Sequence, residues 1–113
     1  MITSTTRVKD DISIVDLDGK LIAGDAVVLY NTVQGLVGRG VSKILINMDG
    51  LDLMDSSGLG ELVRTGKLAA SRGATIKLLN IGRDVRRTLE AAGFLGLFET
   101  FDSESVAVAS FRG

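Results

Sequence analysis

Apolar residues along this chain follow two spacings, one typical of strands and one typical of helices. Residues 2–8 and 12–18 are rich in β-branched residues, and the polar Lys9-Asp10-Asp11 between them predicts the turn of an antiparallel hairpin. Over residues 26–37, apolar side chains recur every three or four positions. This spacing predicts a helix, with Asp25 as its N-cap.

The rest of the chain continues the alternation of strand and helix, with glycines at several boundaries. Short apolar runs predict buried strands at 44–48 and 75–81, and a last short strand at 97–101. The predicted helices cover 57–71, 83–92 and 103–111.

The order of these elements, β-β-α-β-α-β-α-β-α, predicts the α/β class. A chain of 113 residues, 45% of them hydrophobic, can bury one core, so we expect a single domain over residues 1–113. Right-handed crossovers place about four helices over a mostly parallel mixed sheet of about five strands, with the first pair antiparallel. Functional groups of such sheets gather at the carboxyl ends of the strands.

Charge and composition exclude several classes of function. Thirteen basic and fourteen acidic residues leave the chain near neutral, without a basic run suited to nucleic acid or a membrane surface. The chain has no cysteine and no long apolar span, so we expect a cytoplasmic protein. It also lacks histidine, which excludes Ser-His-Asp and Cys-His nucleophiles and the usual zinc sites; no metal or cofactor is expected.

Residues 55–60, Asp-Ser-Ser-Gly-Leu-Gly, stand where an apolar strand gives way to a helix. Serines at a helix start lie beside free backbone N–H groups and the positive end of the helix dipole, which favour an anion such as phosphate. One polar side chain suffices as an N-cap, but three occur here, and two glycines each cost the helix about 1 kcal/mol relative to alanine. Small residues in this turn indicate that another molecule approaches closely.

The residues leave several chemistries open for this segment. A nucleophilic serine needs a base, and without histidine only a lysine or a carboxylate such as Asp55 remains. A nucleotide-binding loop needs a longer glycine pattern, and Val63 stands where the third glycine belongs. An aspartyl-phosphate receiver would use Asp49, which follows the strand predicted at 44–48. The simplest interpretation is that one of the three polar residues only caps the helix.

A helical wheel of residues 57–71 separates a buried side from an outward strip. The predicted buried side carries Leu59, Leu62, Val63, Gly66, Ala69 and Ala70. The residues predicted to point outward or to lie at the margin are Ser56, Ser57, Gly60, Arg64, Lys67 and Leu68. An exposed Leu68 has no role in folding, which makes it a candidate docking residue, although a single surface leucine is usually unremarkable.

These motifs resemble those of STAS domains, and specifically of bacterial anti-sigma factor antagonists, over essentially the whole chain. The most specific element is residues 54–60, Met-Asp-Ser-Ser-Gly-Leu-Gly, after a buried strand. Residues 77–81 (Lys-Leu-Leu-Asn-Ile) and 85–89 (Val-Arg-Arg-Thr-Leu) are also typical of the family.

The resemblance implies a regulatory switch without enzymatic activity of its own. The unmodified antagonist binds an anti-sigma factor that is also a serine kinase, and so frees the sigma factor for transcription. Phosphorylation by that kinase ends the binding, and a PP2C-type phosphatase restores it. The family's acceptor is the first serine of the D-S-S-G motif, which falls on Ser56; the helical wheel alone does not choose between Ser56 and Ser57.

The expected partner-binding surface combines the motif with its neighbours. Many antagonists have an acidic residue after a G-x-L sequence, where this chain has Ile22, and Asp25 is the candidate replacement. Gly58 and Gly60 are expected to leave room for the partner. The full set is Asp25, Asp55, Ser56, Ser57, Gly58, Gly60, Arg64, Lys67 and Leu68.

Two other roles stay open for a STAS domain. One is a ligand-sensing or nucleotide-sensing module. The other is a subunit of a larger signalling or transport assembly that is not phosphorylated; the lack of a membrane segment makes an isolated piece of a transporter less attractive.

Overall fold

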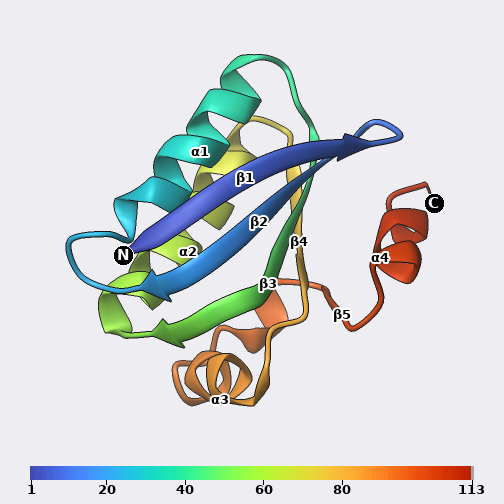
Figure 1. The fold of residues 1–113 in the computed structure, drawn as a ribbon. Coiled ribbons are helices and arrows are strands. Elements are labelled where there is room, and N and C mark those ends of the chain that lie inside the picture. The colour runs from blue at the N-terminus through green and yellow to red at the C-terminus, as the bar shows by residue number, and fades with distance from the viewer. Residues whose placement is uncertain (113) are drawn as a thin grey trace.

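The computed structural model describes residues 1–112, which form one five-stranded mixed sheet (Figure 1). β1 (Ile2–Lys9) pairs antiparallel with β2 (Ile12–Leu21), as the hairpin pattern predicts. β3 (Lys43–Met54), β4 (Thr75–Leu79) and β5 (Thr100–Phe101) follow in parallel, so the strands lie in their order along the chain. Parallel neighbours need crossover connections, and each crossover here carries a helix.

Three helices cover one face of the sheet, and a fourth covers part of the other. α1 (Val27–Gly38), α2 (Ser56–Ser71) and α3 (Arg83–Ala91) connect the parallel strands and share one apolar core. α4 (Glu104–Ser110) follows β5 and lies on the opposite side of the sheet (Figure 1). The predicted element order and mixed sheet are confirmed, with an additional 3₁₀ helix at Leu95–Leu97. No helix among the described residues has the length and hydropathy needed to cross a membrane.

The central strands are apolar on both faces. Val15 and Ile46 lie in the core under α1–α3, whereas Ile14 and Leu45 lie in a smaller cluster under α4. All four side chains are fully buried. A strand covered on both sides needs apolar residues at successive positions, which accounts for the continuous apolar runs in the sequence.

β3 is longer than the sequence pattern predicts. It continues past Met48 to Met54, and its outer half pairs with β2 beyond the last residue that pairs with β4. This outer half pairs with β2 on one side and has no strand on the other, so it is a sheet edge that tolerates the polar residues that look like a strand end in the sequence. Asp49 therefore lies within a strand, and its predicted position after a strand, as in a receiver, is wrong.

The predicted strand at 97–101 is reduced to two residues, Thr100 and Phe101. The 3₁₀ helix before it lets Phe98 face the core, where its side chain is buried. A β-carbon added at Gly66 of α2 would lie 2.9 Å from the Phe98 ring. The 3₁₀ helix includes Leu97, whereas Phe98 keeps an extended backbone, so the last strand begins later than the sequence predicts.

Asp25 is not the N-cap of α1, contrary to the prediction. The backbone N–H groups of Asp25 and Ala26 both donate to the carbonyl of Ile22, and the resulting turn gives Ala26 helical backbone angles. Ala26 is the N-cap, without a side-chain hydrogen bond. The Asp25 carboxylate lies instead 2.9 Å from the amino group of Met1.

Polar contacts hold α4 against the sheet. Arg7 of β1 donates from Nε to Asp16 of β2 at 2.7 Å and from Nη1 to Glu104 of α4 at 3.0 Å. These hydrogen bonds, with Glu104 first and Asp16 second, raise the pKa of Arg7. At the other end of α4, the buried Lys77 of β4 donates to Ser110 Oγ at 2.9 Å. α4 is short, and its position depends on these contacts as well as on its few buried side chains.

We expect the Arg7 contacts to stabilise the fold near neutral pH and to lose that effect in acid. Hydrogen bonds from Arg7 lower the pKa of both Asp16 and Glu104 in the folded state. Because the folded-state values are depressed, the stabilisation is full above the unfolded-state values of about 4 and disappears as the pH falls through the folded-state values. Arg7→Met is therefore expected to lower the free energy of unfolding by about 1 kcal/mol at about pH 7 and by much less at about pH 2.5.

Urea unfolding followed by circular dichroism measures this difference. Arg112→Met, which removes an exposed arginine paired with Asp10, serves as the control. An Arg7→Met effect of the same size at both pH values would contradict the assignment.

Candidate functional site

Asp55 fixes the start of α2 at the carboxyl end of β3. Its backbone is extended, and its Oδ1 accepts from the N–H of Gly58 at 2.8 Å, which makes it the N-cap. Its Oδ2 accepts from the N–H of Ala23 at 3.1 Å. The hydrogen bond from Gly58, followed by that from Ala23, lowers the pKa of Asp55. One carboxylate thus connects the first turn of α2 to the loop between β2 and α1.

Gly58 lets the first turn of α2 lie against the end of β2. It is buried, and a β-carbon built on it would overlap the carbonyl oxygen of Leu21. The same carbonyl accepts the N–H of Asp55 at 3.3 Å. The room at Gly58 is therefore used by the chain itself, and the expectation that it serves a partner is wrong for this residue. Gly60 is exposed, with no atom within 4 Å of an added β-carbon, and so keeps an open surface.

Ser56 and Ser57 are the first two residues of α2, and both are exposed. Asp55 already caps the helix, so neither hydroxyl is needed for that role. Ser56 lines a shallow hollow of about 560 Å³ that reaches across to α3, whereas Ser57 does not. The structure therefore presents Ser56 beside a surface made by two helices.

The outward strip predicted for α2 is only partly exposed. Arg64 is exposed, but its guanidinium lies 3.7 Å from the centroid of the Tyr30 ring on α1 and 3.1 Å from Glu61. Lys67 is exposed and lies about 16 Å from Ser56 along the helix axis. Leu68 is partly buried and packs against the main core, so its predicted exposure is wrong.

A second flank of α2 is buried because the helix packs sideways against α1. Thr65 is fully buried, although the helical wheel did not place it on the buried side. Ala70 is exposed, although the helical wheel placed it on the buried side. Leu68 follows Thr65 by three residues and so shares this flank. The buried face of α2 is therefore rotated toward α1 relative to the prediction.

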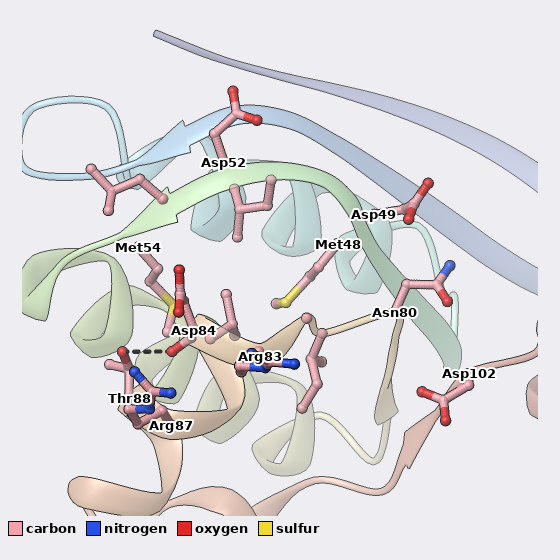
Figure 2. A pocket seen from close by; sticks show the side chains of 15 residues that line it. Met48, Asp49, Asp52, Met54, Asn80, Arg83, Asp84, Arg87, Thr88 and Asp102 are labelled. Carbon is pink, nitrogen blue, oxygen red and sulfur yellow. Dashed lines mark hydrogen bonds between the residues drawn. The ribbon is translucent and has the colours of Figure 1, made fainter.

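A second hollow of about 640 Å³ lies at the carboxyl ends of β3 and β4 (Figure 2). Its lining includes the apolar Met48 and Met54 and the charged Asp84 and Arg83. The hydroxyl of Thr88 donates to the carbonyl of Asp84 at 3.0 Å, the dashed line in Figure 2. Among residues 1–112, no group of three or more potential metal ligands is arranged to hold a metal ion.

Comparison with known proteins decides the family of this fold. The family model described as "STAS domain" matches residues 3–107. This chain belongs to the STAS domain family. The resemblance carried by residues 54–60 and by the two later motifs is therefore confirmed at the level of the family.

Relatives of this STAS domain include proteins named as antagonists. BtrV of Bordetella bronchiseptica, whose name gives it provisionally as an anti-sigma factor antagonist, is 25% identical over 103 residues, covering 91% of this chain and 89% of BtrV. The crystal structure of an anti-sigma factor antagonist from Mycobacterium paratuberculosis superimposes with a TM-score of 0.87 at 19% identity, covering 100% of this chain and 96% of that one.

Bacillus SpoIIAA shares the same fold. Its unphosphorylated form gives a TM-score of 0.75 at 21% identity, covering 98% of this chain and 99% of SpoIIAA. Its phosphorylated form gives 0.74 at 20% identity, covering 97% and 100% of the two chains. Both forms are therefore about equally similar in fold to this STAS domain.

The structure brings most of the expected site residues to one edge of the sheet. Asp55, Ser56, Ser57 and Gly60 lie at the start of α2, and Ala23 joins them to the loop that contains Asp25. Two exposed apolar residues on the neighbouring elements lie outside the expected set of site residues. They are Val27 at the start of α1 and Leu53 near the end of β3, which are 43% and 50% exposed.

Arg87 is the most informative residue that sequence reasoning missed as part of the site. It belongs to α3, thirty-one positions from Ser56 along the chain, and it lines the same hollow. The typical family motif at 85–89 contains it, but nothing in the local pattern relates it to the serine. Only the packing of α3 beside the start of α2 brings the two residues to one surface.

The two glycines of α2 are expected to respond in opposite ways to an added methyl group. Gly58→Ala places a β-carbon on the Leu21 carbonyl, and we expect a loss of about 3 kcal/mol or more. Gly60→Ala meets open space and improves helix propensity, and we expect a gain of up to about 1 kcal/mol. Urea unfolding of the two variants and the wild type tests the pair; equal losses would show that the assigned packing of Gly58 is incorrect.

Proposed function

We propose that this STAS domain is an anti-sigma factor antagonist that is switched off by phosphorylation of Ser56. In the unmodified state it binds an anti-sigma factor that is also a serine kinase, and so frees the sigma factor. In the switching step, Ser56 Oγ attacks the γ-phosphorus of ATP held by the kinase, an Oγ–P bond forms, ADP leaves, and the hydroxyl proton passes to the kinase. A PP2C-type phosphatase reverses this by transferring the phosphoryl group to water, which releases inorganic phosphate.

The observation that carries the proposal is the way the first turn of α2 is built. Asp55 caps the helix, and Gly58 allows the helix to pack against the end of β2. The backbone at Ser56 is therefore held in place, and the exposed Ser56 hydroxyl has no role in stabilising the fold. A hydroxyl that is exposed and has no role in the fold can accept a phosphoryl group from another protein. The names of the relatives and the phosphorylated form of SpoIIAA, which shares the fold, support the same role.

The proposed partner surface surrounds this serine. Gly60 adds no side chain to the surface of α2, so a partner can approach the helix backbone there. The exposed Val27 and Leu53 supply apolar area on the neighbouring elements. Phosphorylation brings a charge of about −1.5 to −2 to the centre of that surface, beside the ionised Asp55. Bulk and negative charge at a closely packed interface favour release of the partner, without any need to unfold the antagonist.

The serine assignment is tested by incubating the protein with its cognate kinase and ATP and mapping the label. We expect labelling of the wild type and of Ser57→Ala, and loss of labelling in Ser56→Ala. Both serines are exposed and neither caps the helix, so the two variants form a matched pair of similar stability. A label that persists in Ser56→Ala would reject the assignment to this residue.

The outcome of the same incubation also separates the other roles of a STAS domain. A protein that neither accepts phosphate nor binds the kinase would contradict the proposal and favour a subunit of a larger assembly. A regulatory role without catalysis is part of the proposal, and it requires that kinase and phosphatase activity reside in the partners alone.

The fold is expected to survive phosphorylation. Ser56 lies outside both apolar clusters, and a phosphate at the first position of a helix is favoured by the helix dipole. The phosphorylated protein should therefore show an unchanged far-ultraviolet circular dichroism spectrum and a melting temperature within about 4 °C of the unmodified protein. Loss of helical signal on phosphorylation would mean that release occurs by unfolding instead.

A further inference from the structure

The hollow beside Ser56 is lined from two helices and carries few charges. Its lining from the α2 side consists of Met54, Asp55, Ser56 and Leu59, and from the α3 side of Arg87, Thr88, Ala91 and Ala92. The two alanines are exposed, and their short side chains leave the α3 side of the hollow open. Only two charged side chains line the hollow, Asp55 and Arg87.

Arg87 brings a free positive charge to this hollow. It is exposed, and the ion pairs formed among residues 1–112 do not include it. The other basic residues of the expected surface are engaged or distant. Arg64 stacks on Tyr30 and pairs with Glu61, and Lys67 lies three helical turns away.

Asp55 makes the cap position of α2 unfavourable for a phosphoryl group on Ser56. Its carboxylate already accepts the N–H of Gly58, so the cap position on the helix axis holds a negative charge. The hydrogen bonds to this carboxylate lower the pKa of Asp55 and keep it ionised at neutral pH. Repulsion between two anions disfavours the cap position for the phosphoryl group, and Arg87 is the positive charge on the hollow that Asp55 and Ser56 both line.

We propose that Arg87 binds the phosphoryl group of phosphorylated Ser56 across this hollow, and so holds the modified side chain against the surface of its own chain. The proposal rests on the proposed phosphorylation of Ser56 and adds a receiving residue to it. A planar guanidinium can donate two parallel hydrogen bonds to phosphate oxygens, which a lysine at this position would not reproduce. The contact links α2 to α3 in the modified state only.

This contact gives α3 a part in the switch. Arg87 also lines the larger hollow at the ends of β3 and β4, as does Thr88, so both residues border the two hollows. Drawing Arg87 toward Ser56 changes the charge in both hollows. A partner that contacts α3 would therefore sense phosphorylation even if it did not touch Ser56.

The test uses phosphoserine placed at position 56 during translation, so that no kinase is required. The second ionisation of phosphoserine, normally near a pKa of about 6, is followed by ³¹P nuclear magnetic resonance in the wild type and in Arg87→Gln. We expect Arg87→Gln to raise this pKa by about 0.5, because a neighbouring cation favours the dianion. The charged groups facing the phosphate are Asp55 from α2 and Arg87 from α3, with Arg83, Asp84 and Glu90 one turn from Arg87.

Arg83→Gln is the matched control. Arg83 is an exposed arginine on the same helix, but it lines only the larger hollow. A phosphate pKa that rises in Arg87→Gln and stays near the wild-type value in Arg83→Gln supports the contact. An unchanged pKa in Arg87→Gln, or equal rises in both variants, would overturn it, the latter because a general positive field would then account for the effect.

A second readout identifies the contact directly. In ¹⁵N-labelled protein, the Nε–H signal of Arg87 is expected to shift when residue 56 is phosphoserine, and that of Arg83 to stay in place. An unshifted Arg87 signal also overturns the proposal. Failure of the kinase to label Ser56, by contrast, counts against the proposed function, because the titration does not depend on the kinase.

Discussion

The close approach of α2 to the end of β2 is the constraint on which the site depends. Gly58 allows it, since any side chain would overlap the Leu21 carbonyl, and that carbonyl also receives the N–H of Asp55. The Asp55 carboxylate then caps α2 and holds Ala23 of the next loop. One glycine and one carboxylate thus fix three chain segments at the same edge of the sheet. The serines are positioned by these contacts and take no part in them.

The exposed surface at the start of α2 is separate from the contacts that hold the fold together. The two apolar clusters lie on either side of the sheet, and the polar contacts that hold α4, from Arg7 and Lys77, lie away from the start of α2. A charge added at Ser56 is therefore not buried and breaks no hydrogen bond of the fold. The residues that stabilise the fold therefore differ from those of the proposed phosphorylation site, so a modification there would change the surface without changing the scaffold.

The sequence predicted the order of elements because each buried strand is short, apolar and followed by a turn or helix signal. It failed where long-range packing decides local structure. The outer half of β3 is polar because β4 does not extend along it, the 3₁₀ helix at Leu95–Leu97 takes up the start of the predicted last strand, and α1 buries the flank of α2 that carries Thr65 and Leu68. None of these contacts leaves a periodic signal in its own segment.

The candidate site likewise has a part that the sequence predicts and a part that depends on long-range packing. Residues 55–60 could be found from sequence because cap, serines and glycines are adjacent, but the separate roles of Gly58 and Gly60 could not, since both are small residues in one helical turn. Arg87 could not be related to Ser56 because the relation exists only across the α2–α3 boundary. A serine at a helix start is a general feature, whereas a serine that shares a hollow with an unpaired arginine is particular to this arrangement of helices. The features that would distinguish a phosphoserine at this position therefore come from the packing, and the local motif describes only the half of the site that carries the proposed acceptor.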